Sequence, residues 1–128
     1  MTAATDFVFY LAFAGLIAHE LDAVHKREWR LLFVLRSMPE APARTAFVLA
    51  HVPLLAVLLW LLSRDGSPAF WTAAALDVFM AVHAGLHWRL SARPEYDFHS
   101  ASSRLLIYGT AAVALAHLGL LVLVGWAR

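Results

Sequence analysis

Residues 45–63 read TAFVLAHVPLLAVLLWLLS and contain no Lys, Arg, Asp or Glu. Residues 105–127 form a second stretch without any of these four residue types. About 20 residues of α-helix cross the hydrocarbon core of a bilayer, so each stretch is long enough to span it. A chain with two such stretches is expected to be an integral membrane protein.

The composition of the 128-residue chain supports the same interpretation. Hydrophobic residues make up 62% of the sequence and charged residues only 15%, whereas soluble domains are roughly 45–50% apolar. Two further apolar segments complete a set of expected transmembrane helices over residues 7–25, 45–62, 70–90 and 104–126. Loops containing Pro or Gly separate these segments.

We therefore predict one transmembrane domain over residues 1–128, folded as an all-α, up-down-up-down four-helix bundle. Residues 27–36 mix charged and bulky apolar side chains, which predicts a helical extension of the first helix along the membrane interface. No Lys or Arg precedes Lys26, so the basic start of a cleavable signal peptide is missing. The first apolar segment is thus expected to remain in the mature protein.

Lys and Arg residues are distributed unevenly over the loops. The first and third loops contain Lys26, Arg27, Arg30, Arg36, Arg44, Arg89, Arg93 and Arg104. The opposite side has only Arg64 and Arg128. Basic loops stay in the cytoplasm, so we expect both termini outside it. With a formal net charge of +1, the chain lacks the basic surface that binding to nucleic acid requires.

The first predicted helix ends in a dense polar motif, HELDAVHKRE at residues 19–28. Within it His19, Asp22, His25 and Glu28 recur at every third residue. Each such step rotates by roughly 60° around a helix, so neighbouring members can share a ligand but all four cannot. The third predicted helix contains H-x-x-x-H at residues 83–87, which places two imidazoles on one helix face.

Depth in the membrane brings further histidines to the same level. His19, His51 and His83 each lie about two turns inside the cytoplasmic end of a different helix, roughly 10 Å deep. The third loop, which contains His99, can fold over these histidines. Since the sequence contains no cysteine, a metal must use nitrogen and oxygen ligands, and this set suits iron or zinc. The expected metal ligands are His19, Asp22, His25, His51, His83, His87 and His99.

The remaining ionisable groups have alternative interpretations. Glu20 and Glu28 are candidates for general acid or base work in an enzyme. Each glutamate could also be a metal ligand or form an ion pair with Lys26, Arg27 or Arg30. Of these two interpretations, the ion pair is favoured. His51 alone on an apolar helix is also typical of a packing histidine. Two deeper groups, at residues 77 and 117, are expected to pair as a buried acid and imidazole, Asp77 with His117, for structure or proton relay.

The motif at His19 to Ala23 resembles that of small bacterial membrane proteins of unknown function named for an H-x-x-E-E sequence. Asp22 and Ala23 stand where the two glutamates of that motif would be. His51 and the H-x-x-x-H pair resemble the polar motifs that this group carries on other helices. The resemblance spans three of the four segments and implies a bacterial inner-membrane protein, at most an enzyme of undefined chemistry.

Three functions fit these residues. The leading hypothesis is a metal-dependent membrane enzyme with one or two ions, iron or zinc, which acts on a lipid-soluble substrate near the cytoplasmic face. The number of candidate ligands tilts this hypothesis towards two metals. The alternatives are a haem-binding electron carrier, using His51 with His83 or His117, and a proton or metal-ion conduit. Small residues at 14 and 18 and at 112 and 116 could support a homodimer.

Overall fold

The computed structural model describes residues 3–126, with side chains through Leu123, and every regular element among them is helical. The elements are α1 (Ala3–His25), η1 (Glu28–Arg30), α2 (Glu40–Leu62), α3 (Ser67–Leu90), α4 (Ala101–Arg104), η2 (Leu105–Gly109) and α5 (Thr110–Trp126). Four spans, α1, α2, α3 and the run Ala101–Leu123, are long and apolar enough to cross a membrane. The predicted fold class is confirmed, although each span begins a few residues earlier than expected.

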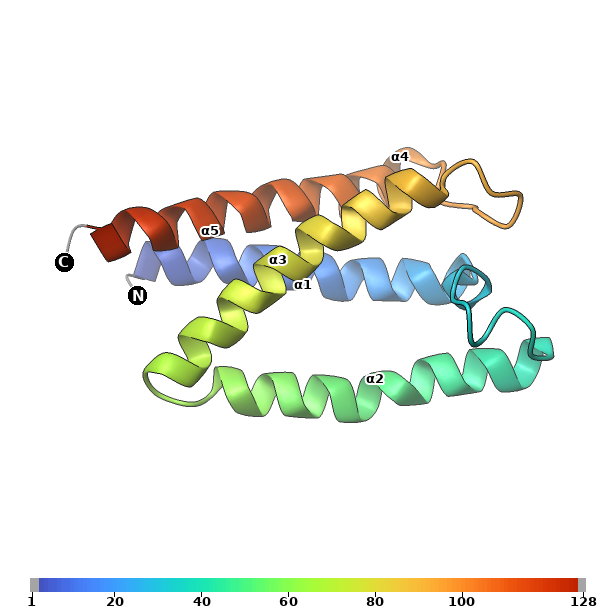
Figure 1. The fold of residues 1–128 in the computed structure, drawn as a ribbon, viewed down its shortest axis with the longest axis horizontal. Coiled ribbons are helices and arrows are strands. Elements are labelled where there is room, and N and C mark those ends of the chain that lie inside the picture. The colour runs from blue at the N-terminus through green and yellow to red at the C-terminus, as the bar shows by residue number, and fades with distance from the viewer. Residues whose placement is uncertain (1–2, 127–128) are drawn as a thin grey trace.

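The four spans alternate in direction, as Figure 1 shows. The segments 26–39 and 91–100 lie together at one end of the bundle, which we call the basic end because most Lys and Arg residues flank it. The turn at residues 63–66 lies at the opposite end, where α1 begins and α5 ends. Arg128, which entered the orientation count, lies outside the described residues.

Helices α1, α3 and α5 form the packed core, whereas α2 stands apart from α1 (Figure 1). Ala12, Ala73 and Ala114, one from each core helix, are buried in one apolar cluster, and their small side chains allow the helices to approach closely. Among the described side chains of α2, only Ala43 and Phe47 are buried. Because α2 packs on the rest of the bundle near its two ends, through Phe47 near its start and Leu58 and Leu62 near its end, cavities form between it and the other helices.

Gly15 marks a close approach between α1 and α5. A methyl group at this position would overlap the hydroxyl oxygen of Thr110. Gly15→Ala is therefore expected to force the helices apart and lower the free energy of unfolding by about 1–3 kcal/mol. Reversible unfolding in mixed micelles measures this change. At Gly85 in α3 an added Cβ meets nothing within 4 Å, so Gly85→Ala is the matched control and should be neutral or stabilising.

The segment after α1 differs from the predicted helical extension. Helix α1 ends at His25, Arg27 adopts the left-handed backbone conformation with φ 58°, and only the short turn η1 follows. The reversal brings Glu28 and Trp29 back against the helices, and both side chains are buried. Trp29 packs against Phe47 of α2, with ring centroids 5.8 Å apart, and this burial stabilises the chain reversal and the direction of the segment.

Arg30 stabilises the irregular segment that follows η1. Its Nη1 donates to the carbonyl oxygens of Arg36 and Met38, at 3.1 and 3.0 Å. Its Nη2 forms an ion pair with Glu40 at the start of α2. These bonds satisfy backbone carbonyls that an ordinary helix would have paired internally, so the segment can stay irregular and still hold η1 in place.

Candidate metal centre

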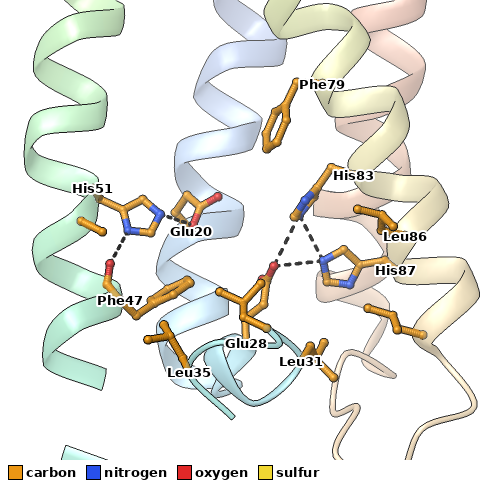
Figure 2. A pocket seen from close by; sticks show the side chains of 13 residues that line it. Glu20, Glu28, Leu31, Leu35, Phe47, His51, Phe79, His83, Leu86 and His87 are labelled. Carbon is orange, nitrogen blue, oxygen red and sulfur yellow. Dashed lines mark hydrogen bonds and ion pairs between the residues drawn. The ribbon is translucent and has the colours of Figure 1, made fainter. Parts of the chain in front are cut away.

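A cavity of about 380 Å³ lies between α1, α2 and α3 and is closed by η1 and the residues after it (Figure 2). Leu and Phe side chains make up most of its wall. Polar groups face it in two places, with Glu20 and His51 on one side and Glu28, His83 and His87 on the other. A small molecule in this cavity would contact both polar groups.

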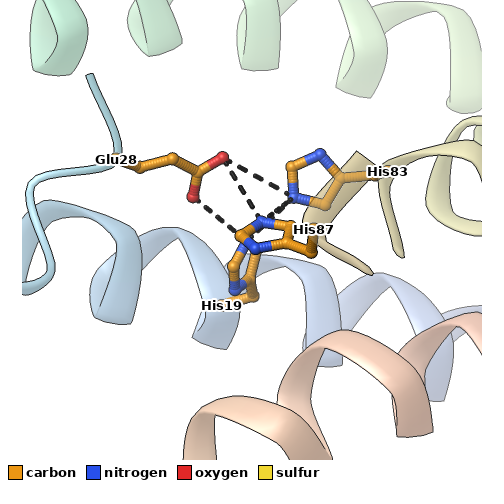
Figure 3. A group of neighbouring side chains, drawn as sticks. All are labelled: His19, Glu28, His83 and His87. Carbon is orange, nitrogen blue, oxygen red and sulfur yellow. Dashed lines mark hydrogen bonds and ion pairs between the residues drawn. The ribbon is translucent and has the colours of Figure 1, made fainter. Parts of the chain in front are cut away.

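Four donor side chains converge beside this cavity, and we call them the His/Glu cluster: His19, Glu28, His83 and His87. Their ligating atoms all lie within 4.8 Å of one another (Figure 3). The Nε2 atoms of His19 and His83 are 2.9 Å apart, and those of His83 and His87 are 3.1 Å apart. Oxygens of Glu28 lie 3.3 Å from His19 Nε2 and 3.6 Å from His87 Nε2.

These separations suit one small cation. Metal–nitrogen bonds of about 2.0–2.1 Å in a tetrahedral shell hold neighbouring donors roughly 3.3 Å apart. Five of the six donor pairs of the His/Glu cluster are 2.9 Å to 3.7 Å apart, on both sides of that value, when both carboxylate oxygens of Glu28 are used, and no pair of ligating atoms exceeds 4.8 Å. A cation can accept the lone pairs of all four groups at once, whereas neutral imidazoles each offer only one N–H donor to their neighbours.

Helix geometry explains three members of the cluster and the chain reversal explains the fourth. The H-x-x-x-H spacing places His83 and His87 on one face of α3, and His19 meets them from α1. If α1 had continued as a helix, Glu28 would lie about 180° around it from His19. Because α1 ends at His25 and the chain turns back at Arg27, Glu28 instead faces His19.

The ion pairs favoured from the sequence for Glu20 and Glu28 were wrong. Glu28 contacts the three cluster histidines, and Glu20 contacts His51. The basic side chains pair with other acids, as Lys26–Asp97, Arg27–Glu40 and Arg30–Glu40. Lys26, Arg27 and Arg30 are close to both glutamates in the sequence, but the chain reversal after α1 directs these basic side chains away from Glu20 and Glu28.

Glu28 supplies the negative charge of the cluster. Burial alone would raise the pKa of its carboxyl group, and the side chain is almost fully buried. Close contacts with the imidazoles of His19 and His87, whose Nε2 atoms lie 3.3 and 3.6 Å from its oxygens, outweigh burial and lower the pKa of Glu28 to about 2. An ionised carboxylate beside three imidazoles is a donor set that attracts a divalent transition metal.

Two aromatic residues of the third loop, Tyr96 and Phe98, pack against the cluster. The Tyr96 hydroxyl and His87 Nδ1 are hydrogen-bonded at 3.2 Å. Burial, reinforced by Tyr108, raises the pKa of Tyr96 to about 12, so the hydroxyl stays protonated, and it can accept from His87 Nδ1–H when His87 Nε2 holds a metal. The Phe98 ring centroid lies 4.7 Å from that of His87. This arrangement leaves His87 Nε2 free to point into the cluster.

Sequence reasoning missed these two aromatic residues and selected His99 instead. Residues 96–99 form an extended segment in which Tyr96 and Phe98 are buried while Asp97 and His99 are exposed. Side chains alternate between the two sides of an extended chain, and the apolar pair faces inward. The order Tyr-Asp-Phe-His was the signal that could have identified them.

Tyr96→Phe is expected to weaken metal binding without abolishing it. The variant removes the hydroxyl that orients His87, and loss of such an outer hydrogen bond typically costs about 10–100-fold in metal affinity. Competition with a chelator of known affinity measures the change. Tyr10→Phe, at an exposed position of α1, is the control and should bind metal as the wild type does. Equal affinities for both variants would show that the Tyr96 hydroxyl does not support the site.

Four other predicted ligands lie outside the His/Glu cluster. Asp22 accepts a hydrogen bond from the Ser103 hydroxyl at 2.6 Å. His25 and His99 are exposed, and the His99 ring packs on that of Tyr96 with centroids 5.2 Å apart. His51 is directed to Glu20 rather than to His83. The structure thus brings together His19, His83 and His87 of the seven predicted ligands and adds Glu28.

Glu20 and His51 form a pair that links α1 to α2 across the cavity. His51 Nδ1 lies 2.7 Å from the carbonyl oxygen of Phe47, and its Nε2 lies 2.9 Å from Glu20 Oε2. A carbonyl has no proton to give, so Nδ1 carries the proton of that bond. A second proton must therefore lie between Nε2 and the carboxylate, and the pair can exchange it with a ligand in the cavity.

The predicted pair of Asp77 and His117 is confirmed. Asp77 Oδ2 and His117 Nδ1 are 2.6 Å apart, and both side chains are completely buried between α3 and α5. The ring of Phe9 from α1 lies against His117 with centroids 5.3 Å apart. Neither residue of this pair belongs to the His/Glu cluster, so the described part of the bundle contains two separate buried polar groups.

Comparison with known families assigns the chain to a group without a known activity. Residues 5–124 match the family of unknown function DUF6713, and the chain belongs to that family. No curated protein and no solved structure shows significant similarity to it. The chemistry must therefore be inferred from the site itself.

Proposed function

We propose that this DUF6713 member is a metal-dependent membrane enzyme that binds one divalent ion through His19, His83, His87 and Glu28. The observation that carries the proposal is the convergence of these four donors, from α1, α3 and η1, within 4.8 Å of one another. Converging imidazoles inside a membrane protein are costly unless they bind something, since each needs a partner there. The bound ion would act as a Lewis acid beside the cavity.

One ion fits this site better than two. The cluster offers four donors, and Asp22, His25 and His99, which a second ion would require, point elsewhere. Three imidazoles and one carboxylate fill the tetrahedral shell of zinc, which is the pattern of a structural site. Iron accepts more ligands and would keep open positions for a ligand from the adjoining cavity. An enzyme with this donor set is therefore expected to use iron.

The substrate is proposed to come from the bilayer. The cavity beside the cluster has a mainly apolar wall and opens between α2 and the other spans. Glu20, with His51, would be the proton donor or acceptor for a substrate held there. The basic end is proposed to face the cytoplasm of a bacterial inner membrane, since basic loops resist translocation.

Elemental analysis of the protein purified in detergent tests the proposal. We expect about one equivalent of iron per chain, removed by a strong chelator and restored by Fe(II). Zinc in a closed shell would indicate a structural site, and less than about a tenth of an equivalent of any transition metal would refute the metal centre.

The two alternative functions have their own signatures. A haem protein would show sharp visible absorption bands, which a non-haem ion held by His and Glu lacks. A conduit would carry protons or metal ions across liposomes and retain little metal after purification. The proposed enzyme is expected to show neither behaviour.

A further inference from the structure

A second cavity, of about 510 Å³, lies between α1, α2 and α3 on the side away from the basic end. Its wall is made mainly of leucines from α2 together with Trp71, Ala75 and Phe79 of α3. Glu20, His51 and Phe79 line both this cavity and the one beside the His/Glu cluster. The two cavities therefore meet at the Glu20–His51 pair, and an apolar chamber leads to the metal centre.

We propose that this chamber binds the hydrocarbon chain of a single-chain lipid with an uncharged polar head, and that the head lies at Glu20 and His51. The inference rests on the proposed function and names the substrate class of that site. Figure 2 shows Glu20, His51, Phe79 and His83 around the place where the head would lie. A head held there would face the same cavity as Glu28, His83 and His87, the residues that would hold the metal.

The dimensions of the chamber fit one chain. Its α2 wall runs from His51 to Leu61, about 15 Å along the helix, which is half of the roughly 30 Å hydrocarbon core and so the depth of one leaflet. A methylene group occupies a volume similar to the roughly 30 Å³ share of a water molecule. The chamber of about 510 Å³ thus holds on the order of 15–20 such groups, enough for one long chain and too few for the two chains of a phospholipid.

The polar lining excludes a phosphate head. Phosphates in proteins are held mainly by Arg, Lys or clustered backbone N–H groups. Neither cavity has a Lys or Arg among the described residues that line it, and the Glu20–His51 pair, which shares a second proton, carries no net positive charge for a phosphate. A hydroxyl or similar neutral head can instead donate to Glu20 and accept from His51 Nε2. The expected ligand is therefore a long-chain alcohol or another neutral amphiphile.

Photolabelling with a long-chain alcohol that carries a diazirine in mid-chain tests this inference on the full-length protein in nanodiscs. We expect saturable labelling at chamber residues such as Leu58, Trp71 and Ala75, displaced by excess unlabelled alcohol. Ala75→Phe fills the chamber and should lower saturable labelling at least about tenfold. Ala56→Phe is the matched control, because Ala56 is an exposed residue of α2 that lines neither cavity, and its labelling should equal that of the wild type.

Each outcome bears on the inference. Leu55→Trp narrows the same chamber from α2 and is expected to lower saturable labelling as Ala75→Phe does. Labelling that does not saturate, or that is equal in Ala75→Phe, Leu55→Trp and Ala56→Phe, would show that bulk lipid fills the chamber and would overturn the proposal. Displacement by a long-chain phosphate monoester as effectively as by the alcohol would overturn the neutral head. Metal content measured on the same samples separates the two proposals: saturable labelling without metal refutes the enzyme alone, and metal without saturable labelling refutes the chain site alone.

Discussion

Replacing His83 with alanine is expected to reduce the bound metal from about one equivalent per chain to less than about a tenth. His83 Nε2 lies at the centre of the His/Glu cluster, 2.9 Å from His19 Nε2 and 3.1 Å from His87 Nε2. Its loss leaves two imidazoles and Glu28, and the other donors that line the cavity among the described residues, Glu20 and His51, are held by each other. Elemental analysis after dialysis against a weak chelator measures the change.

Two histidines outside the cluster provide matched controls for this experiment. His25→Ala and His99→Ala change exposed side chains that contact none of the four donors in the described structure, so both variants should keep the full metal content. A third variant, His51→Ala, separates the cluster from the wider set of ligands predicted from the sequence. If His51→Ala loses metal as completely as His83→Ala does, the four-donor assignment is incorrect.

Membrane spans were predictable because their signal is a physical requirement of the bilayer. A span must be apolar over about 20 residues, and no partner elsewhere in the chain is needed to satisfy that rule. The H-x-x-x-H pair was predictable for a similar reason, since the helix itself places residues 83 and 87 on one face. Matching depth added His19, which does lie beside His83.

The rest of the site depended on contacts that the helical period does not contain. Glu28 reaches the cluster only because Arg27 turns left-handed, and a period of 3.6 residues extended through this point predicts the wrong face. His51 has the right depth but lies on α2, the span that stands apart, so it meets Glu20 before it meets His83. Depth fixes one coordinate of a side chain, whereas a shared site requires all three.

Asp77→Ala is expected to be among the most destabilising substitutions in the bundle, lowering the free energy of unfolding by about 3 kcal/mol or more. Asp77 and His117 are completely buried, and the 2.6 Å bond between Oδ2 and Nδ1 joins α3 to α5. Removing the carboxylate leaves the imidazole of His117 desolvated without that partner. Unfolding in mixed micelles measures the loss, with Asp65→Ala in the exposed turn after α2 as the matched control.

The double variant Asp77→Leu/His117→Leu tests whether the pair serves stability or something else. Replacing both partners of a buried polar pair by apolar groups of similar volume is often neutral or stabilising, so the double variant should recover most of the stability that Asp77→Ala loses. Metal content should be unchanged in all of these variants, because neither residue belongs to the His/Glu cluster. A double variant that is stable and metal-loaded but no longer turns over its substrate would show that the pair relays protons. A pair with a purely structural role could be replaced by well-packed apolar side chains without loss of activity.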